Sequence, residues 1–139
     1  MPGRIIRAFS DRMLAPVSGW KVVHWLATVV MLWLGFLFCL PGNTFELSPA
    51  YYYFLQAGSE GEWAVVFLLV GLGGIIGGVT ASLNLKLFAG MILSIAHGVV
   101  AVMFLAGSPL STGSGTYAAI AVAATMRFWR LVKVRTHDG

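Results

Sequence analysis

The chain has 139 residues, of which 58% are hydrophobic and 10% are charged, with a formal net charge of +4 at pH 7 and a mean hydropathy of +0.85. Soluble globular domains contain about 25% charged residues. The composition therefore excludes an ordinary soluble domain and predicts an all-α, polytopic integral membrane protein that forms a single domain over residues 1–139.

The first predicted element is "RIIRAFSDRMLAP", residues 4–16. Ile5, Phe9 and Met13 recur at helical spacing on one face, and the charged side chains lie elsewhere. Pro16 ends the pattern before the first long apolar run. Basic amphipathic segments of this kind are typical of the membrane interface. We expect this segment to lie flat on the cytoplasmic leaflet with its apolar face towards the lipid.

Apolar stretches long enough to cross a membrane follow. A helix needs about 20 mostly apolar residues to span the roughly 30 Å hydrocarbon layer. The apolar core of the last stretch, Tyr117–Met126, is short and rich in alanine. The sequence predicts four transmembrane helices, at about residues 20–40, 63–82, 85–106 and 110–132.

The connection between the first two spans contains "SPAYYYFLQAG", which predicts a short surface helix near Pro49–Ala57 in the first extracytoplasmic loop. A serine before a proline is a helix-start signal, and a glycine ends the segment. Its aromatic residues suit the headgroup region, as an ordinary aromatic belt or as a surface for a partner. The residues expected at the interface are Trp20, Tyr51, Tyr52, Tyr53, Phe54, Trp63 and Trp129.

The distribution of charge predicts the orientation of the spans. Basic residues precede the first span, occupy the second connection and close the chain, whereas the first connection holds Glu46, Glu60 and Glu62 and no basic residue. Lys and Arg in short loops concentrate on the cytoplasmic side. We therefore expect both termini to be cytoplasmic, in a membrane that is best interpreted as a bacterial inner membrane.

The stretch "GLGGIIGGVTASLN", residues 71–84, raises the question of a phosphate-binding loop. A dinucleotide loop needs G-x-G-x-x-G, but Ile76 occupies the position of the third glycine. A P-loop needs a lysine, and none occurs between Lys21 and Lys86. The sequence therefore favours helix packing over phosphate binding for these glycines.

Small residues four apart share one face of a helix and let two helices approach closely in lipid. Two such rows lie on the second span and one on the third, so we expect these two spans to form an antiparallel pair. One of the two rows on the second span is not needed for this pair, and it would contact another copy or another protein. The rows are Gly73, Gly77 and Ala81; Gly74, Gly78 and Ser82; and Gly90, Ser94 and Gly98.

The predicted spans contain no Asp or Glu, no metal-ligating cluster and no nucleophile beside a base, so the sequence predicts no enzyme activity, no cofactor and no metal. His97 lies in mid-span. It could act as a gate, a proton-sensing switch or a ligand contact. We expect instead a structural role, with the imidazole hydrogen-bonded across the bundle. His24 lies near the cytoplasmic end of its span, from which it can reach the interface, and it suggests no site. Cys39, the only cysteine, is expected to be a small buried residue.

The stretch "TFELSPAYYYF", followed by "EWAVVFLLVGL", resembles small multi-span membrane proteins of tailed phages, and the size and basic tail are similar to those of holins. The resemblance covers about residues 40–75 and transfers no catalytic or binding residue. In size and span number the chain also resembles the small multidrug-resistance transporters. The functional glutamate of their first helix has no counterpart between Trp20 and Leu40.

Two functions remain open from the sequence. The first is a non-enzymatic membrane protein that acts through helix–helix assembly, as a holin-like oligomer or as a small subunit of a membrane complex. The second is a small pore or transporter that uses His97 and the glycine-rich second span. The expected partners are the lipid bilayer and further membrane subunits, identical or different, and not nucleic acid.

Overall fold

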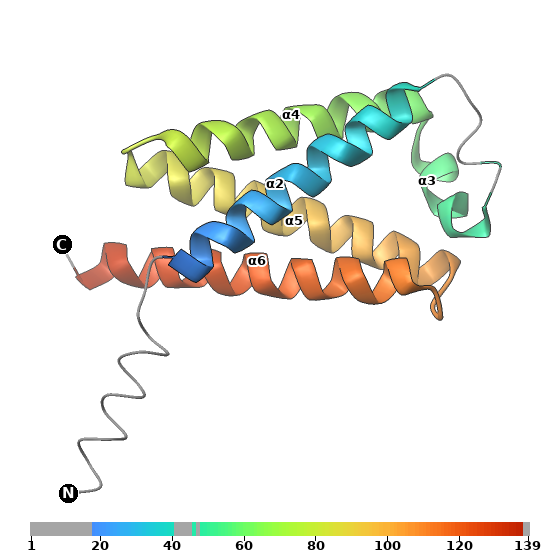
Figure 1. Ribbon diagram of the computed structural model, residues 1–139. Coiled ribbons are helices and arrows are strands. Elements are labelled where there is room, and N and C mark those ends of the chain that lie inside the picture. The colour runs from blue at the N-terminus through green and yellow to red at the C-terminus, as the bar shows by residue number, and fades with distance from the viewer. Residues whose placement is uncertain (1–17, 41–45, 47, 138–139) are drawn as a thin grey trace, which may run out of the picture.

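The computed structural model describes residues 18–40, 46 and 48–137, and this part of the chain is all-α (Figure 1). The expected amphipathic segment at residues 4–16 lies outside the described residues. Within them, the elements are α2 (Ser18–Cys39), the 3-10 helix η1 (Pro49–Tyr51), α3 (Tyr52–Ala57), α4 (Glu60–Val79), α5 (Leu83–Gly107) and α6 (Thr112–His137).

The four long helices form two antiparallel pairs, α2 with α4 and α5 with α6 (Figure 1). Helices α4 and α5 are joined by a short connection and also pack against each other, but less extensively than the members of either pair. The expected contact between the second and third spans, α4 and α5, is therefore present, but it is smaller than the contacts within the two pairs. Helix α2 reaches α6 as well, which closes the bundle.

Local hydrogen bonds set the ends of α4. It begins at Glu60, because the Ser59 hydroxyl accepts from the Glu62 N–H at 3.3 Å and the Glu62 carboxylate accepts from the Ser59 N–H at 2.8 Å. It ends at Val79, since the next residue has extended backbone angles. The expectation that the small-residue rows continue to Ala81 and Ser82 is thus wrong. Both follow the end of α4, and Ser82 is the N-cap of α5.

Three of the described helices, α2, α4 and α5, are long and apolar enough to cross a membrane. Helix α6 has 26 residues but is not one of them, because its first turns are polar and its second half carries four Lys or Arg residues. The expected fourth span is therefore not confirmed by length and composition.

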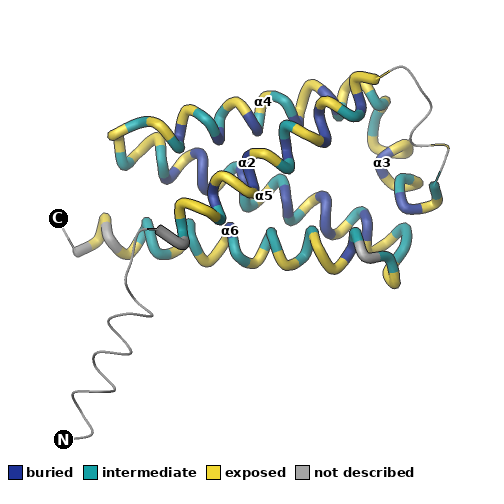
Figure 2. Tube along the Cα trace, in the orientation of Figure 1, coloured by how far each residue is buried: buried dark blue, intermediate teal, exposed yellow. Residues whose placement is uncertain are grey.

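The buried residues line the inner faces of the helices, and the outer faces are exposed (Figure 2). The outer faces carry large apolar side chains, such as Val29 on α2, Leu69 on α4 and Val102 on α5. Large contiguous exposed apolar surfaces are rare on soluble monomers and mark contact with a membrane or a partner. The fold is consistent with an integral membrane protein.

Rings from every described helix and from η1 meet at the end of the bundle that contains α3. Phe54 of α3 is only 1% exposed, and its ring centroid lies 5.2 Å from that of Trp63 and 5.5 Å from that of Phe104. Phe104 stacks in turn on Tyr117 of α6, at 4.9 Å. The Phe54 side chain therefore faces the inside of the bundle, where it anchors α3, and its depth in the membrane stays a prediction. Cys39, expected to be buried, is exposed.

Candidate functional site

Glycines of α4 form its contact with α2. An added β-carbon would lie 2.5 Å from Leu32 Cδ2 at Gly71, and 2.5 Å from Thr28 Oγ1 at Gly74. At Gly78 it would lie 2.9 Å from an atom of the Trp25 ring. At each of these distances something must shift. The Thr28 atoms that face Gly74 lie next to the backbone of α2, whereas the Leu32 and Trp25 atoms belong to the outer parts of longer side chains, so Gly74 limits the separation of α2 and α4 most strictly.

Helix α2 supplies a matching small residue. A β-carbon added at Gly35 would lie 2.9 Å from the backbone nitrogen of Leu68. Glycines on both helices therefore let the two backbones approach closely, as packing in lipid favours. Neither Gly35 nor Gly71 was in the predicted rows, although the spacing of Gly71, Gly74 and Gly78 on one helix face is visible in the sequence.

The remaining predicted row of α4 faces a different side. Gly77 contacts α5, where an added β-carbon would overlap Ala89. At Gly73 an added β-carbon would meet no atom within 4 Å. Gly73 lies in an apolar groove of about 290 Å³ between α4 and α5, which we call the α4–α5 groove. Its other lining residues include Leu69, Val70, Ile76, Leu85, Phe88 and Ile92.

The small residues of α5 do not form a row against α4. Gly90 faces α6, where an added β-carbon would lie 3.6 Å from Arg127 Nη1. The Ser94 hydroxyl donates to the Gly90 carbonyl at 2.8 Å, within α5 itself. At Gly98 an added β-carbon would meet nothing within 4 Å. The structure thus brings together Gly74, Gly78 and α2, and separates them from the row on α5.

His97 is fully buried in α5, with 0% exposure. Its Nδ1 lies 2.8 Å from the Leu93 carbonyl oxygen, one turn earlier on the same helix. The expected hydrogen bond across the bundle is therefore replaced by a bond within the helix. Its Nε2 is buried and has no hydrogen-bond partner among the described residues.

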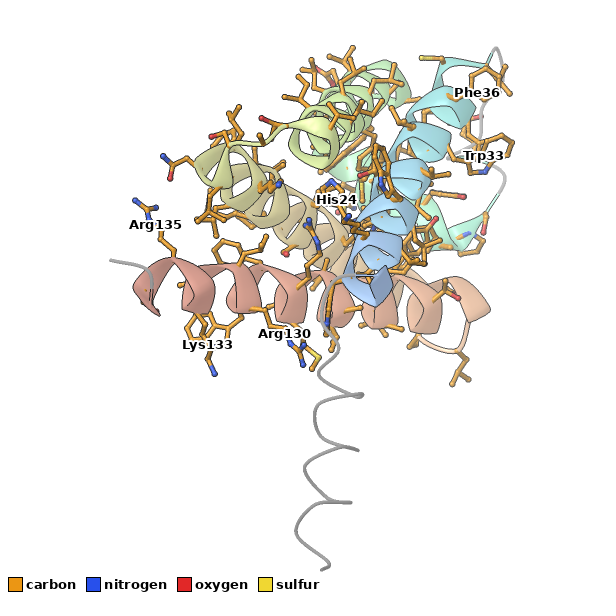
Figure 3. All side chains as sticks on the ribbon, turned by 60° about the vertical axis from the view of Figure 1, so that its left-hand side comes forward. His24, Trp33, Phe36, Arg130, Lys133 and Arg135 are labelled. Carbon is orange, nitrogen blue, oxygen red and sulfur yellow. The ribbon has the colours of Figure 1, made fainter. Side chains whose placement is uncertain are left out.

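His24 is the polar contact that the sequence did not indicate. It is 2% exposed, and its Nε2–H donates to the Gly74 carbonyl of α4 at 2.8 Å. The Thr28 hydroxyl donates to the His24 carbonyl at 2.8 Å, and Arg127 of α6 acts electrostatically on the imidazole. The side chain lies inside the bundle (Figure 3). His24 therefore links α2 to α4 rather than reaching the interface.

The predicted interfacial tryptophans have three different environments. The Arg130 guanidinium lies over the ring of Trp20, 4.5 Å from its centroid, which is a cation–π contact between α6 and α2. Trp129 is exposed on the outer side of α6. Trp63 is half-buried and donates its indole N–H to the Phe54 carbonyl at 3.0 Å.

The tyrosines divide in the same way. Tyr52 and Tyr53 are exposed, whereas Tyr51 is half-buried against the rings of Phe38 and Phe104. Burial, and to a smaller extent the Glu60 carboxylate, raises the pKa of the Tyr51 hydroxyl above its usual value. Of these three tyrosines, only Tyr52 and Tyr53 have the exposure expected of an aromatic belt.

In the part of the chain that the structure describes, no group of three His, Cys, Asp or Glu residues could hold a metal ion. No family model, curated protein or solved structure matches this chain. The fold defines a class, a small helical protein with three helices suited to a membrane. Its two candidate sites are the His24–Gly74 contact inside the bundle and the α4–α5 groove on its surface.

Proposed function

We propose that the chain is an integral protein of a bacterial inner membrane and that α6 is a fourth span. A helix of 26 residues is roughly 39 Å long, which exceeds the roughly 30 Å hydrocarbon layer. Helix α6 packs along α5 and exposes Val122, Met126 and Trp129 on its outer side. Packing against α5 supports this assignment, because polar residues that face a neighbouring helix cost less in lipid than those that face the hydrocarbon.

The described charges support an orientation with both termini in the cytoplasm. One end of the bundle holds the start of α2, the α4–α5 connection and the end of α6, and the other end holds α3 (Figure 1). Lys and Arg concentrate on the cytoplasmic side of membrane proteins. The basic residues at or near the first end are Lys21, Lys86, Arg127, Arg130, Lys133 and Arg135, and the acidic residues at the other are Glu46, Glu60 and Glu62. On this orientation η1 and α3 form the extracytoplasmic surface helix.

In this membrane the protein acts through helix–helix assembly, as a holin-like homo-oligomer and not as an enzyme. The observation that carries this proposal is the open position of Gly73. The other α4 glycines named above are already packed against α2 or α5, whereas Gly73 faces the apolar α4–α5 groove. A small residue in an apolar groove allows a further helix to approach closely in lipid.

The outer face of α2 supplies a complementary surface for a second copy. Trp33 and Phe36 point away from the bundle (Figure 3), with 57% and 52% of their surfaces exposed and ring centroids 5.9 Å apart. A protruding aromatic pair on one face and a groove on another favour a head-to-tail contact, which generates rings or open arrays. The alternative occupant of the groove is a helix of a different protein, with this chain as a small subunit.

The experiment compares Gly73→Leu and Trp33→Ala with the control Val79→Leu on the exposed face of α4. We expect the first two variants to lower both the mass of the particle extracted in native lipid and the permeabilisation of the membrane after expression. Val79→Leu keeps both, because Val79 is 70% exposed and lies outside the groove. Unchanged mass and permeabilisation in the first two variants contradict homo-assembly. A particle that contains other proteins indicates the small-subunit role.

A small pore or transporter is the second candidate. The observation that favours it is the incomplete hydrogen bonding of two buried imidazoles, since His24 Nδ1 and His97 Nε2 lack partners among the described residues. Buried polar groups in a membrane interior often mark a path for a solute or proton. For a pore formed by one chain, Gly73→Leu leaves the mass unchanged while permeation changes. The same variant therefore separates the two functions.

A further inference from the structure

A second groove lies between α5 and α6 and adjoins the α4–α5 groove, since Phe88 lines both. It has a volume of about 400 Å³. Its apolar walls come from α5 and from the end of α6, and it carries polar side chains at one end only. The apolar residues are Leu87, Phe88, Met91, Phe128 and Val132, and the polar residues are Asn84 and Arg135. We call it the α5–α6 groove.

The polar and apolar residues are separated along the helix axes. Asn84 lies in the first turn of α5 and Arg135 near the end of α6. Because the two helices are antiparallel, these residues lie at the same end of the bundle. Met91 and Phe128 lie about two turns deeper, which is roughly 10 Å along a helix. The groove therefore changes from polar to apolar over the distance that separates a lipid headgroup from its acyl chain.

The charge at the polar end is positive. The Arg135 side chain rises from α6 towards the start of α5, whereas Arg130 and Lys133 extend from the other side of α6 (Figure 3). No acidic residue lines the groove, and the described Glu residues lie at the far end of the bundle. A guanidinium forms paired hydrogen bonds to a phosphate group more readily than an ammonium does. The groove therefore complements an anionic headgroup above an apolar chain.

We propose that the α5–α6 groove is a binding site for one anionic glycerophospholipid, with the lipid phosphate on Arg135 and an acyl chain against Met91 and Phe128. The site depends on the membrane placement proposed above, but not on assembly. It would lie on the cytoplasmic side, where anionic lipids attract basic residues close to the membrane. The bound lipid covers the polar end of the contact between α5 and α6.

The test uses the full-length chain, extracted from vesicles of equal parts phosphatidylglycerol and phosphatidylcholine, with the bound lipids counted by native mass spectrometry. We expect the wild type to retain phosphatidylglycerol. Arg135→Gln should lower this retention about tenfold, since the paired hydrogen bonds to phosphate are lost. The control Lys133→Gln removes the same charge from the same helix and should change retention less than about twofold. Met91→Trp should also lower retention, because the larger ring fills the groove.

Equal losses in Arg135→Gln and Lys133→Gln contradict the proposal, since they indicate diffuse attraction to the membrane. Unchanged retention in Arg135→Gln and Met91→Trp contradicts it as well. Inorganic phosphate should not displace the lipid, and displacement would show a simple anion site that needs no acyl chain. If the wild type does not enter these vesicles, the membrane placement itself is wrong, so that failure is distinguishable from failure of the lipid site.

Discussion

Gly74→Leu is expected to destabilise the bundle by about 3 kcal/mol, the upper end of the typical range for overpacked sites. Even an alanine β-carbon would lie 2.5 Å from Thr28 Oγ1 and 2.9 Å from Thr28 Cγ2. These atoms sit close to the backbone of α2, so α2 itself must move away from α4. That movement also weakens the hydrogen bond from His24 to the Gly74 carbonyl.

The measurement is an SDS titration of the purified protein in mixed micelles, followed by tryptophan fluorescence. Gly74→Ala should give a smaller loss of stability in the same direction. Gly98→Ala is the matched control, because its β-carbon meets nothing within 4 Å and alanine favours a helix over glycine by about 1 kcal/mol. If Gly74→Ala and Gly98→Ala unfold at the same SDS fraction, the glycines do not set the separation of α2 and α4.

Phe54→Ala should cost about 3 kcal/mol, at the lower end of the range for a buried phenylalanine, because it opens a cavity where several helices meet. The Phe54 ring contacts Phe38 of α2, Phe67 of α4 and Phe104 of α5. Its loss should therefore loosen that whole end of the bundle. Amide hydrogen exchange should accelerate in α3 and in the adjoining turns of α4 and α5.

The control for Phe54→Ala is Tyr52→Ala in the same short helix. Tyr52 is 52% exposed, and substitutions at exposed positions usually change stability by less than about 0.5 kcal/mol. Similar hydrogen exchange in the two variants would mean that α3 is not held by Phe54. In that case the aromatic residues of the first connection would act only as an interfacial belt.

The helices themselves could be predicted from the sequence, because each long apolar run can satisfy its backbone in lipid only as a helix. Their ends were harder to predict, although the signal at α4 is visible: Ser59 and Glu62 have the spacing of a capping box. Reading that pattern would have moved the predicted start of the helix from Trp63 to Glu60. At the other end, Thr80 leaves the helix without a proline to mark the position.

The partners of the glycines could not be predicted, because spacing within a helix identifies a face but not the helix that covers it. Gly74 and Gly78 were correctly placed on a common face, yet that face meets α2 and not α5. His24 shows the same limit. Its position near the end of an apolar run suggested the interface, whereas the rotation of α2 about its axis directs its ring to the Gly74 carbonyl. Only the packing of the helices decides that rotation.

The central claim, a bundle that crosses the membrane four times, is tested most directly by cysteine labelling in intact cells. Glu60→Cys and Lys133→Cys are each introduced with Cys39→Ala, which removes the only native thiol. A membrane-impermeant maleimide should label position 60 from outside and position 133 only after the membrane is opened, since these positions lie at opposite ends of the bundle. Labelling of both positions from the same side would contradict the four-span account.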